Sequence, residues 1–227
     1  MLIIKYLNIT SHLVYGFYIV LFSYSKKDLE QRTAILQAWS SKLLKILNVH
    51  LEVVGELPPE LTSYLMVSNH ISWLDIHVIN AVKPVRFVAK KEVASWPVFG
   101  WFAKKINTLF IDRQRLGHSK DVSNDMANAL KAGDKICIFP EGTSTDGKEV
   151  LRFRPNLFQS VIDAKSSCLP VSISYFNKVS GEPTTATAFI GDMGLIESIN
   201  NTIKNAPISV RVNICLLYTS DAADDLL

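Results

Sequence analysis

Three short blocks of this sequence carry side chains that could perform acid–base chemistry. The first, residues 69–75, places His70 and Asp75 five positions apart, the second ends at Arg113, and the third contains Glu141. An imidazole can take a proton from a hydroxyl group, a carboxylate can orient that imidazole, and a guanidinium can bind a phosphate or a carboxylate. Together the blocks predict a site that activates a hydroxyl group next to an anionic group.

The spacing within the first block restricts how its histidine and aspartate can meet. On a continuous helix, residues five apart are separated by about 140° of rotation, so they would not share a face. We therefore expect His70 in a turn at the end of a strand over residues 64–68, and Asp75 in the first turn of the following helix. Asp75 would then accept the Nδ1 proton of His70 and leave Nε2 free as a base.

No serine or cysteine accompanies this pair in a G-x-S-x-G nucleophile elbow. The sequence therefore favours a substrate hydroxyl as the nucleophile, deprotonated by His70, over a covalent acyl-enzyme. The remaining histidines have no comparable neighbours and are predicted to be structural; they are His12, His50, His77 and His118.

The other two blocks also follow apolar, β-rich runs. Residues 108–111 lead into Asp112 and Arg113, so Arg113 could bind an anionic group or simply pair with Asp112 on the surface. In residues 139–144, Gly142 permits a close backbone approach, and Glu141 can accept hydrogen bonds from hydroxyl groups.

In their combination and order, these blocks resemble the glycerolipid acyltransferase family, over roughly residues 49–214. The resemblance implies transfer of a fatty acyl group from acyl carrier protein or coenzyme A to a lysophospholipid such as 1-acylglycerol 3-phosphate. It implies no bound cofactor or metal, and membrane lipids as a further partner. The residues it implies are His70 and Asp75 for catalysis, and Asn69, Arg113, Glu141, Gly142 and Thr143 for substrate binding.

The third block departs from the family pattern, in which an arginine often follows the threonine. Here Ser144 and Thr145 stand in that place, and Arg152 or Arg154 could supply the missing positive charge. This variant run is similar to the branch that includes lyso-ornithine lipid acyltransferases, which gives an alternative acceptor.

Other functional classes fit the sequence less well. A lipid hydrolase would need a nucleophile elbow, and a non-catalytic membrane-binding module would not need His70, Asp75 and Glu141 together. Residues 142–148 match the G-x-x-x-x-G-K pattern of a nucleotide-binding loop, but a glutamate follows it where a hydroxyl is required. A net charge of +3 does not indicate nucleic acid and is compatible with an anionic membrane surface. The three cysteines show no metal-binding spacing.

Strand-like and helix-like segments alternate from residue 49 onward, which predicts a single α/β domain with a largely parallel central sheet flanked by helices. The expected strands are 51–54, 64–68, 86–89, 108–111, 135–139, 169–174, 187–190 and 208–214, and the expected helices are 75–82, 97–105, 117–131 and 157–165.

Residues 1–47 are expected to form a pair of membrane-associated helices ahead of the domain. Residues 2–24 are mostly apolar, but the dense part, 13–22, is too short to span a bilayer, so a helix in the interface is as consistent as a span. Residues 28–47 show an apolar stripe at helical spacing, which a helix packed on its own domain would also explain. Lys26 and Lys27 predict the cytoplasmic face.

The last residues resemble no part of a folded domain. Residues 215–224 match the in-frame translation of a sequencing adapter, so we expect residues 215–227 to be non-native. The catalytic domain is accordingly expected to occupy residues 48–214 and to be truncated at its C-terminus.

Overall fold

The computed structural model describes residues 2–95, 99–111 and 118–215. Within these ranges the strands are β1 (Val49–Val54), β2 (Tyr64–Ser68), β3 (Arg86–Lys90), β4 (Leu109–Ile111), β5 (Lys135–Ile138), β6 (Ser167–Asn177) and β7 (Ile208–Ile214). The α-helices are α1 (Leu2–Phe22), α2 (Leu29–Leu47), α3 (Leu74–Val82), α4 (Phe99–Lys105), α5 (His118–Lys131), α6 (Gln159–Ala164) and α7 (Leu195–Lys204). Three 3-10 helices are η1 (Tyr24–Lys26), η2 (Lys91–Ser95) and η3 (Pro155–Leu157).

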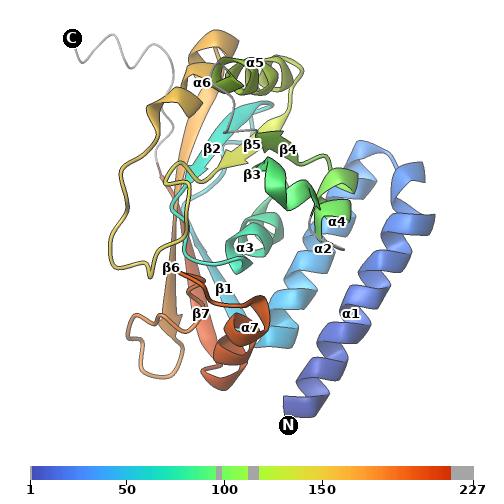
Figure 1. Ribbon diagram of the computed structural model, residues 1–227, viewed down its shortest axis with the longest axis vertical. Coiled ribbons are helices and arrows are strands. Elements are labelled where there is room, and N and C mark those ends of the chain that lie inside the picture. The colour runs from blue at the N-terminus through green and yellow to red at the C-terminus, as the bar shows by residue number, and fades with distance from the viewer. Residues whose placement is uncertain (1, 96–98, 112–117, 216–227) are drawn as a thin grey trace.

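The strands form one sheet in the order β1-β7-β6-β2-β5-β3-β4 (Figure 1). Neighbouring strands are parallel except β6 and β7, so β1 and β7 run opposite to the other five. The predicted fold class, an α/β domain with a largely parallel sheet flanked by helices, is therefore confirmed.

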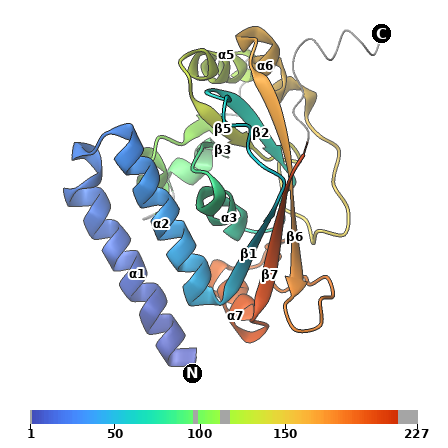
Figure 2. The ribbon, with the colours of Figure 1, turned by 180° about the vertical axis from the view of Figure 1, so that it is seen from behind.

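Helices cover both faces of the sheet, as Figures 1 and 2 show. Alternate residues of β2 point to opposite faces: Tyr64 and Met66 join a cluster with α2, α3 and α7, whereas Leu65 and Val67 join a cluster with α5 and α6. Every residue of β2 is consequently buried, as expected for a central strand of a parallel sheet. The site described below begins where this rigid strand ends.

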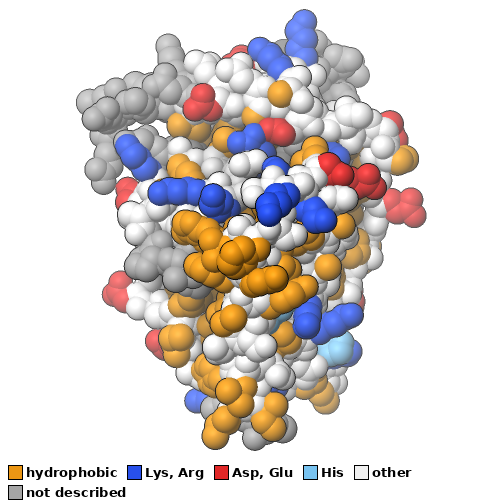
Figure 3. Space-filling model, turned by 90° about the vertical axis from the view of Figure 1, so that its right-hand side faces the viewer, with side chains coloured by type: hydrophobic (Ala, Val, Ile, Leu, Met, Phe, Trp, Pro, Cys, Tyr) orange, Lys and Arg blue, Asp and Glu red, His pale blue; other side chains and the backbone are white. Residues whose placement is uncertain are grey.

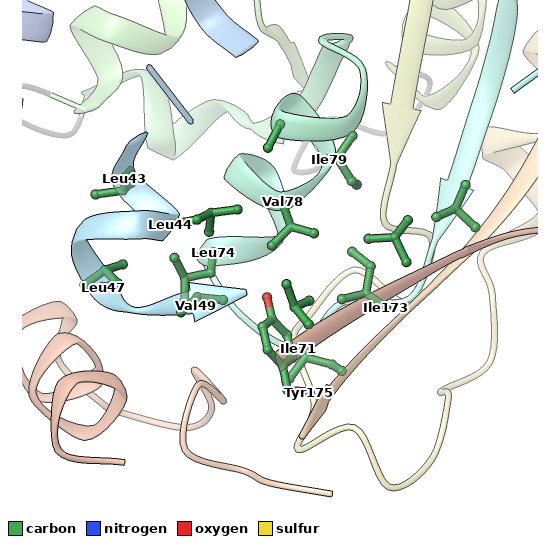
Figure 4. Packing of buried hydrophobic residues seen from close by; sticks show 14 of the residues in the cluster. Leu43, Leu44, Leu47, Val49, Ile71, Leu74, Val78, Ile79, Ile173 and Tyr175 are labelled. Atoms are coloured by element: carbon green, nitrogen blue, oxygen red, sulfur yellow. The ribbon is translucent and has the colours of Figure 1, made fainter. Parts of the chain in front are cut away.

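Helix α2 is part of the core of the domain. Its first turn is capped by Asp28, whose side chain accepts a hydrogen bond from the Gln31 amide at 2.8 Å. At its other end, Leu43, Leu44 and Leu47 are buried against α3 and the sheet (Figure 4). The apolar stripe predicted over residues 28–47 thus packs on the domain itself.

Helix α1 packs against α2 and leaves much of its surface exposed. The rings of His12 and Trp39 stack with their centroids 4.5 Å apart. His12 Nε2 lies 3.0 Å from the Trp39 carbonyl oxygen, and Trp39 Nε1 donates to the His12 carbonyl oxygen at 3.3 Å. A cavity of about 640 Å³ lies between the two helices and is lined by residues of both, among them Tyr15 and Lys42. None of the described helices combines the length and the apolar character that crossing a bilayer requires.

The exposed side of α1 is rich in apolar side chains. The view onto this side shows hydrophobic side chains gathered below a row of lysine and arginine side chains (Figure 3). The exposed apolar residues of α1 are Ile3, Ile4, Leu7, Leu13, Val14, Tyr15, Phe17, Tyr18, Leu21 and Phe22.

In the later part of the chain one expected strand is absent, and one helix was not expected. Residues 187–190 form a turn and irregular backbone instead of a strand. The Phe189 amide donates to the Ile71 carbonyl at 2.9 Å, so this segment attaches to the loop after β2 and not to a sheet edge. Helix α7 was not predicted, because two of its buried residues, Ser198 and Thr202, are polar and interrupt the apolar pattern.

Candidate active site

The candidate site lies at the carboxyl ends of two neighbouring parallel strands. Strand β2 ends at Ser68 and β5 ends at Ile138, and the register pairs Val67 with Ile138. The loop that starts at Asn69 therefore lies beside the loop that starts at Phe139. Ligands of open α/β sheets bind at this kind of edge, outside the carboxyl ends of the strands.

His70 lies in the loop and Asp75 in the first turn of α3, as the sequence predicts. The two side chains meet, with His70 Nδ1 2.8 Å from Asp75 Oδ2. An ionised carboxylate can only accept hydrogen bonds, so Nδ1 is the donor in this contact and Nε2 is the ring nitrogen left to act as an acceptor. The His70 side chain is 22% exposed and that of Asp75 is fully buried.

The buried carboxylate of Asp75 accepts several hydrogen bonds besides that from His70. The backbone amides of Ile71 and Ser72 donate to Oδ2 at 2.7 and 2.9 Å, and the Tyr175 hydroxyl donates to Oδ1 at 2.7 Å. These donors compensate the loss of water around the charge, which allows an ionised carboxylate to remain inside the protein.

The His70 ring is also held by an aromatic neighbour. It stacks on Phe139, with ring centroids 4.0 Å apart and an interplanar angle of 15°, and Phe139 in turn stacks on Phe87 at 6.1 Å. Ring stacking and the Asp75 hydrogen bond fix both the tilt and the rotation of the imidazole. The imidazole is thus held in one orientation.

Glu141 joins two loops of the site. Its Oε1 accepts a hydrogen bond from the His70 amide at 2.7 Å, and its Oε2 accepts one from the Leu151 amide at 2.8 Å. The side chain is 5% exposed. In this structure the carboxylate braces the backbone of His70 against the loop over residues 142–154. The substrate contact expected for Glu141 stays a prediction.

Gly142 has a φ of 76°, in the left-handed region that favours glycine. A Cβ atom at this position would lie 2.7 Å from Nε of Arg154, so the guanidinium of Arg154 packs directly on this turn. Thr143 is exposed beside it. The structure thus brings Arg154 next to the third block, whereas Arg113 lies outside the described residues.

Asn69 fastens the loop to the neighbouring strand. Its side-chain nitrogen donates to the Ile173 carbonyl at 3.0 Å, and its side-chain oxygen accepts from the Ile173 amide at 2.8 Å. Both polar ends of the amide are therefore used by β6. Asn69 stays a predicted substrate-binding residue without a test, but the contact it makes here is structural.

Further backbone contacts hold the loops together. The Thr145 amide donates to the His70 carbonyl at 2.9 Å, and the Ser144 hydroxyl donates to the Phe189 carbonyl. Since Phe189 also donates to Ile71, the segment over residues 187–190 connects the His70 loop with the third block.

Tyr175 and Phe139 belong to this site although sequence reasoning did not single them out. Residues 169, 171, 173 and 175 of β6 alternate inward and are buried, so a tyrosine in this row must find a partner for its hydroxyl. That pattern was the available signal for Tyr175. For Phe139, nothing in the sequence distinguishes a ring that stacks on His70 from an ordinary core residue.

Comparison with known proteins identifies the chain's relatives. Residues 50–174 match the model of a family described as Acyltransferase. The chain is 35% identical over 193 residues to lyso-ornithine lipid O-acyltransferase of Pseudomonas aeruginosa, covering 85% of this chain and 73% of that protein. It is 31% identical over 183 residues to 1-acyl-sn-glycerol-3-phosphate acyltransferase of Neisseria meningitidis, covering 80% and 71%.

A solved structure has the same fold. The crystal structure of the 1-acyl-sn-glycerophosphate acyltransferase from Thermotoga maritima matches with a TM-score of 0.66 at 20% sequence identity, covering 96% of this chain and 84% of that one. At that identity the likeness establishes the fold alone.

Proposed function

The chain belongs to the acyltransferase family, and we propose that it transfers a fatty acyl group from an acyl thioester to the hydroxyl group of a lysolipid. The donor is acyl carrier protein or coenzyme A carrying the acyl group. The acceptor is a lysophospholipid such as 1-acylglycerol 3-phosphate, with lyso-ornithine lipid as the alternative, because two relatives are named for these two substrates.

The contact between His70 and Asp75 carries this proposal. Nδ1 of His70 is bound to Asp75 at 2.8 Å, and among the described residues no group hydrogen-bonds to Nε2. A partly exposed base with a fixed tautomer is what removal of a proton from a substrate hydroxyl requires.

In the proposed reaction, the acceptor hydroxyl attacks the thioester carbonyl while Nε2 of His70 takes the hydroxyl proton. An ester C–O bond forms, the C–S bond breaks, and the proton on Nε2 passes to the departing thiolate. Asp75 stabilises the imidazolium that exists between these two transfers. Cys137 is not a competing nucleophile, because burial, aided by the charge of Asp75, raises the pKa of its thiol well above the usual value.

We propose Arg154 as a contact for the anionic group of the acceptor. Its guanidinium packs on Gly142 in the third block, the side chain is exposed, and it forms no ion pair with the described residues. An arginine can bind either a phosphate or a carboxylate through two parallel hydrogen bonds, so this contact suits both candidate acceptors. Arg113 remains a second candidate for the same role.

We propose that the exposed face of α1 binds the surface of a membrane. Its apolar side chains lie beside lysines and arginines on the same side of the molecule (Figure 3). An apolar face flanked by cationic groups matches the boundary between acyl chains and anionic head groups. The lysines after α1 favour the cytoplasmic face.

Substitution of the catalytic pair tests the proposed reaction. His70→Ala and Asp75→Asn should each reduce acyl transfer by about 10² to 10⁴, the usual contribution of a general base. His50→Ala is the matched control, because His50 is exposed and its side chain contacts only Asn48. Turnover of His70→Ala near that of the unmodified enzyme would exclude the mechanism.

The same assay separates the alternatives. Labelled acyl thioester is supplied with 1-acylglycerol 3-phosphate, with lyso-ornithine lipid, or without an acceptor. Transfer to one lysolipid identifies the acceptor, thioester cleavage that needs no acceptor indicates a hydrolase, and no reaction of any kind indicates a binding module.

A further inference from the structure

Tyr175 on β6 is the one described residue whose side chain contacts Oδ1 of Asp75. Its hydroxyl donates to that oxygen at 2.7 Å, across 100 positions of sequence. The tyrosine is 3% exposed, and its ring lies in the hydrophobic cluster beside Ile71 (Figure 4).

The two oxygens of Asp75 are used unequally. Oδ2 accepts from the His70 ring and from the amides of Ile71 and Ser72, whereas the one hydrogen-bond donor to Oδ1 among the described residues is Tyr175. Rotation of the carboxylate about its bond to Cβ would move both oxygens, so a donor on Oδ1 also restrains Oδ2. The Tyr175 hydroxyl therefore acts together with the donors to Oδ2 to keep that oxygen facing Nδ1 of His70.

The tyrosine is a permanent donor in this environment. Burial, followed by the charge of Asp75 and their hydrogen bond, raises the pKa of Tyr175 well above its usual value, so the hydroxyl keeps its proton. Strand β6 also binds Asn69 through both backbone groups of Ile173. Strand β6 thus holds the loop that carries His70 through Ile173, and it holds the Asp75 carboxylate through Tyr175, two residues further along the strand.

We infer that Tyr175 is a positioning residue for the acyl transfer: it fixes the Asp75 carboxylate, and through it the imidazole of His70. This inference rests on the proposed function, in which His70 is the base. It assigns to Tyr175 an effect on the rate of the chemical step, and none on the binding of either substrate.

Tyr175→Phe removes the hydroxyl and keeps the ring. Because hydrogen bonds to charged groups are among the stronger ones, kcat should fall about ten- to a hundredfold, with KM for thioester and lysolipid unchanged within about twofold. Tyr64→Phe is the matched control: Tyr64 is also buried, on the adjacent strand β2, and its hydroxyl has no hydrogen-bond partner in the described chain. This control should keep normal kcat.

A double-mutant cycle separates positioning from a general loss of structure. In an Asp75→Ala background the carboxylate is absent, so adding Tyr175→Phe should change the remaining kcat by less than about twofold. Rates are divided by the folded fraction of each variant, measured by near-ultraviolet circular dichroism.

Two results would overturn the inference. One is a kcat of Tyr175→Phe within about twofold of the unmodified enzyme, and the other is an equal loss with and without the Asp75 carboxylate. Failure of the proposed function is recognised separately: either the unmodified protein transfers no acyl group, or His70→Ala keeps normal turnover, whatever Tyr175→Phe does.

Discussion

Replacing Glu141 by glutamine tests whether this carboxylate braces the site or binds substrate. Both of its oxygens accept backbone hydrogen bonds, from His70 at 2.7 Å and from Leu151 at 2.8 Å. Glutamine has one oxygen and one NH₂ group, and the NH₂ group cannot accept a hydrogen bond. In either orientation of the amide, therefore, one backbone N–H loses its acceptor and faces another donor.

The structure allows the size of this effect to be worked out. The lost hydrogen bond was made to a charged group, which is typically worth about 1.5–3 kcal/mol, and the surviving one becomes a weaker neutral bond. Glu141 is 5% exposed, so water has little access to the unpaired N–H group. We expect Glu141→Gln to lower the free energy of unfolding by about 2–4 kcal/mol, a large part of the 5–15 kcal/mol typical of domains.

Two measurements on the same variant distinguish the roles of Glu141. Urea unfolding gives the change in stability, and steady-state kinetics give kcat and KM for each substrate. A brace predicts lower stability and lower kcat, with KM for the lysolipid unchanged, because the position of His70 is disturbed. A contact with the acceptor predicts a higher KM for the lysolipid and little change in stability.

Glu149→Gln is the matched control for this experiment. Glu149 lies in the same loop, is exposed, and its carboxylate makes no hydrogen bond or ion pair in the described structure. Its free energy of unfolding should stay within about 0.5 kcal/mol of the unmodified protein. A change equally small for Glu141→Gln would refute the brace.

Three further outcomes are expected. Arg154→Ala should raise KM for the lysolipid about three- to tenfold and leave KM for the thioester unchanged, because an exposed charge contact is lost. Leu7→Glu with Val14→Glu should weaken binding to anionic liposomes at least about tenfold in a sedimentation assay, since two exposed apolar side chains of α1 are removed. Burial, aided by His12, lowers the pKa of His77 to about 4. The folded protein therefore disfavours protonation of His77, and its free energy of unfolding should fall as the pH drops from 6.5 toward 4, by at most about 3 kcal/mol. His77→Phe should remove this part of the pH dependence of urea unfolding.

The first two of these have a matched control in the chain. Lys148 is an exposed cation in the same loop as Arg154, but it already forms an ion pair with Asp146. Lys148→Ala should therefore leave KM for the lysolipid unchanged. Val179→Glu with Ile162→Glu alters equally exposed apolar residues outside α1 and should leave liposome binding intact. Equal effects in a variant and its control would contradict the role assigned to Arg154 or to α1. An unchanged pH dependence in His77→Phe would contradict the pKa assigned to that histidine.

Most of the strands and the contact between His70 and Asp75 were predictable because they depend on local sequence. A five-residue apolar run such as Tyr64–Ser68 is long enough for a buried strand and is followed directly by polar residues. His70 and Asp75 are five positions apart, and the short loop from the end of β2 to the start of α3 leaves their side chains few ways to meet. For such pairs, spacing and backbone geometry decide the contact.

The partners of the remaining site residues were not predictable, because they lie far away in the sequence. Asn69 binds Ile173 across 104 positions, and Tyr175 reaches Asp75 across 100. A sequence shows that Asn69 carries a donor and an acceptor, but not whether a substrate or another backbone segment uses them. In the same way, a sequence shows that Glu141 can accept hydrogen bonds but not that its two partners in the structure are backbone amides.

This difference between local and distant contacts affects how variants of the site must be interpreted. His70 and Arg154 are accessible and few protein groups depend on them, so their loss should change kinetics more than stability. Asp75 and Glu141 are buried and hold backbone amides of the His70 loop, so their loss leaves donors unpaired inside the protein. Lost activity in those variants therefore identifies a direct chemical role only when the folded fraction is shown to be unchanged. The conservative Tyr175→Phe exchange, which removes one hydroxyl and leaves every backbone amide paired, gives the cleaner measure of how far the orientation of Asp75 controls the reaction.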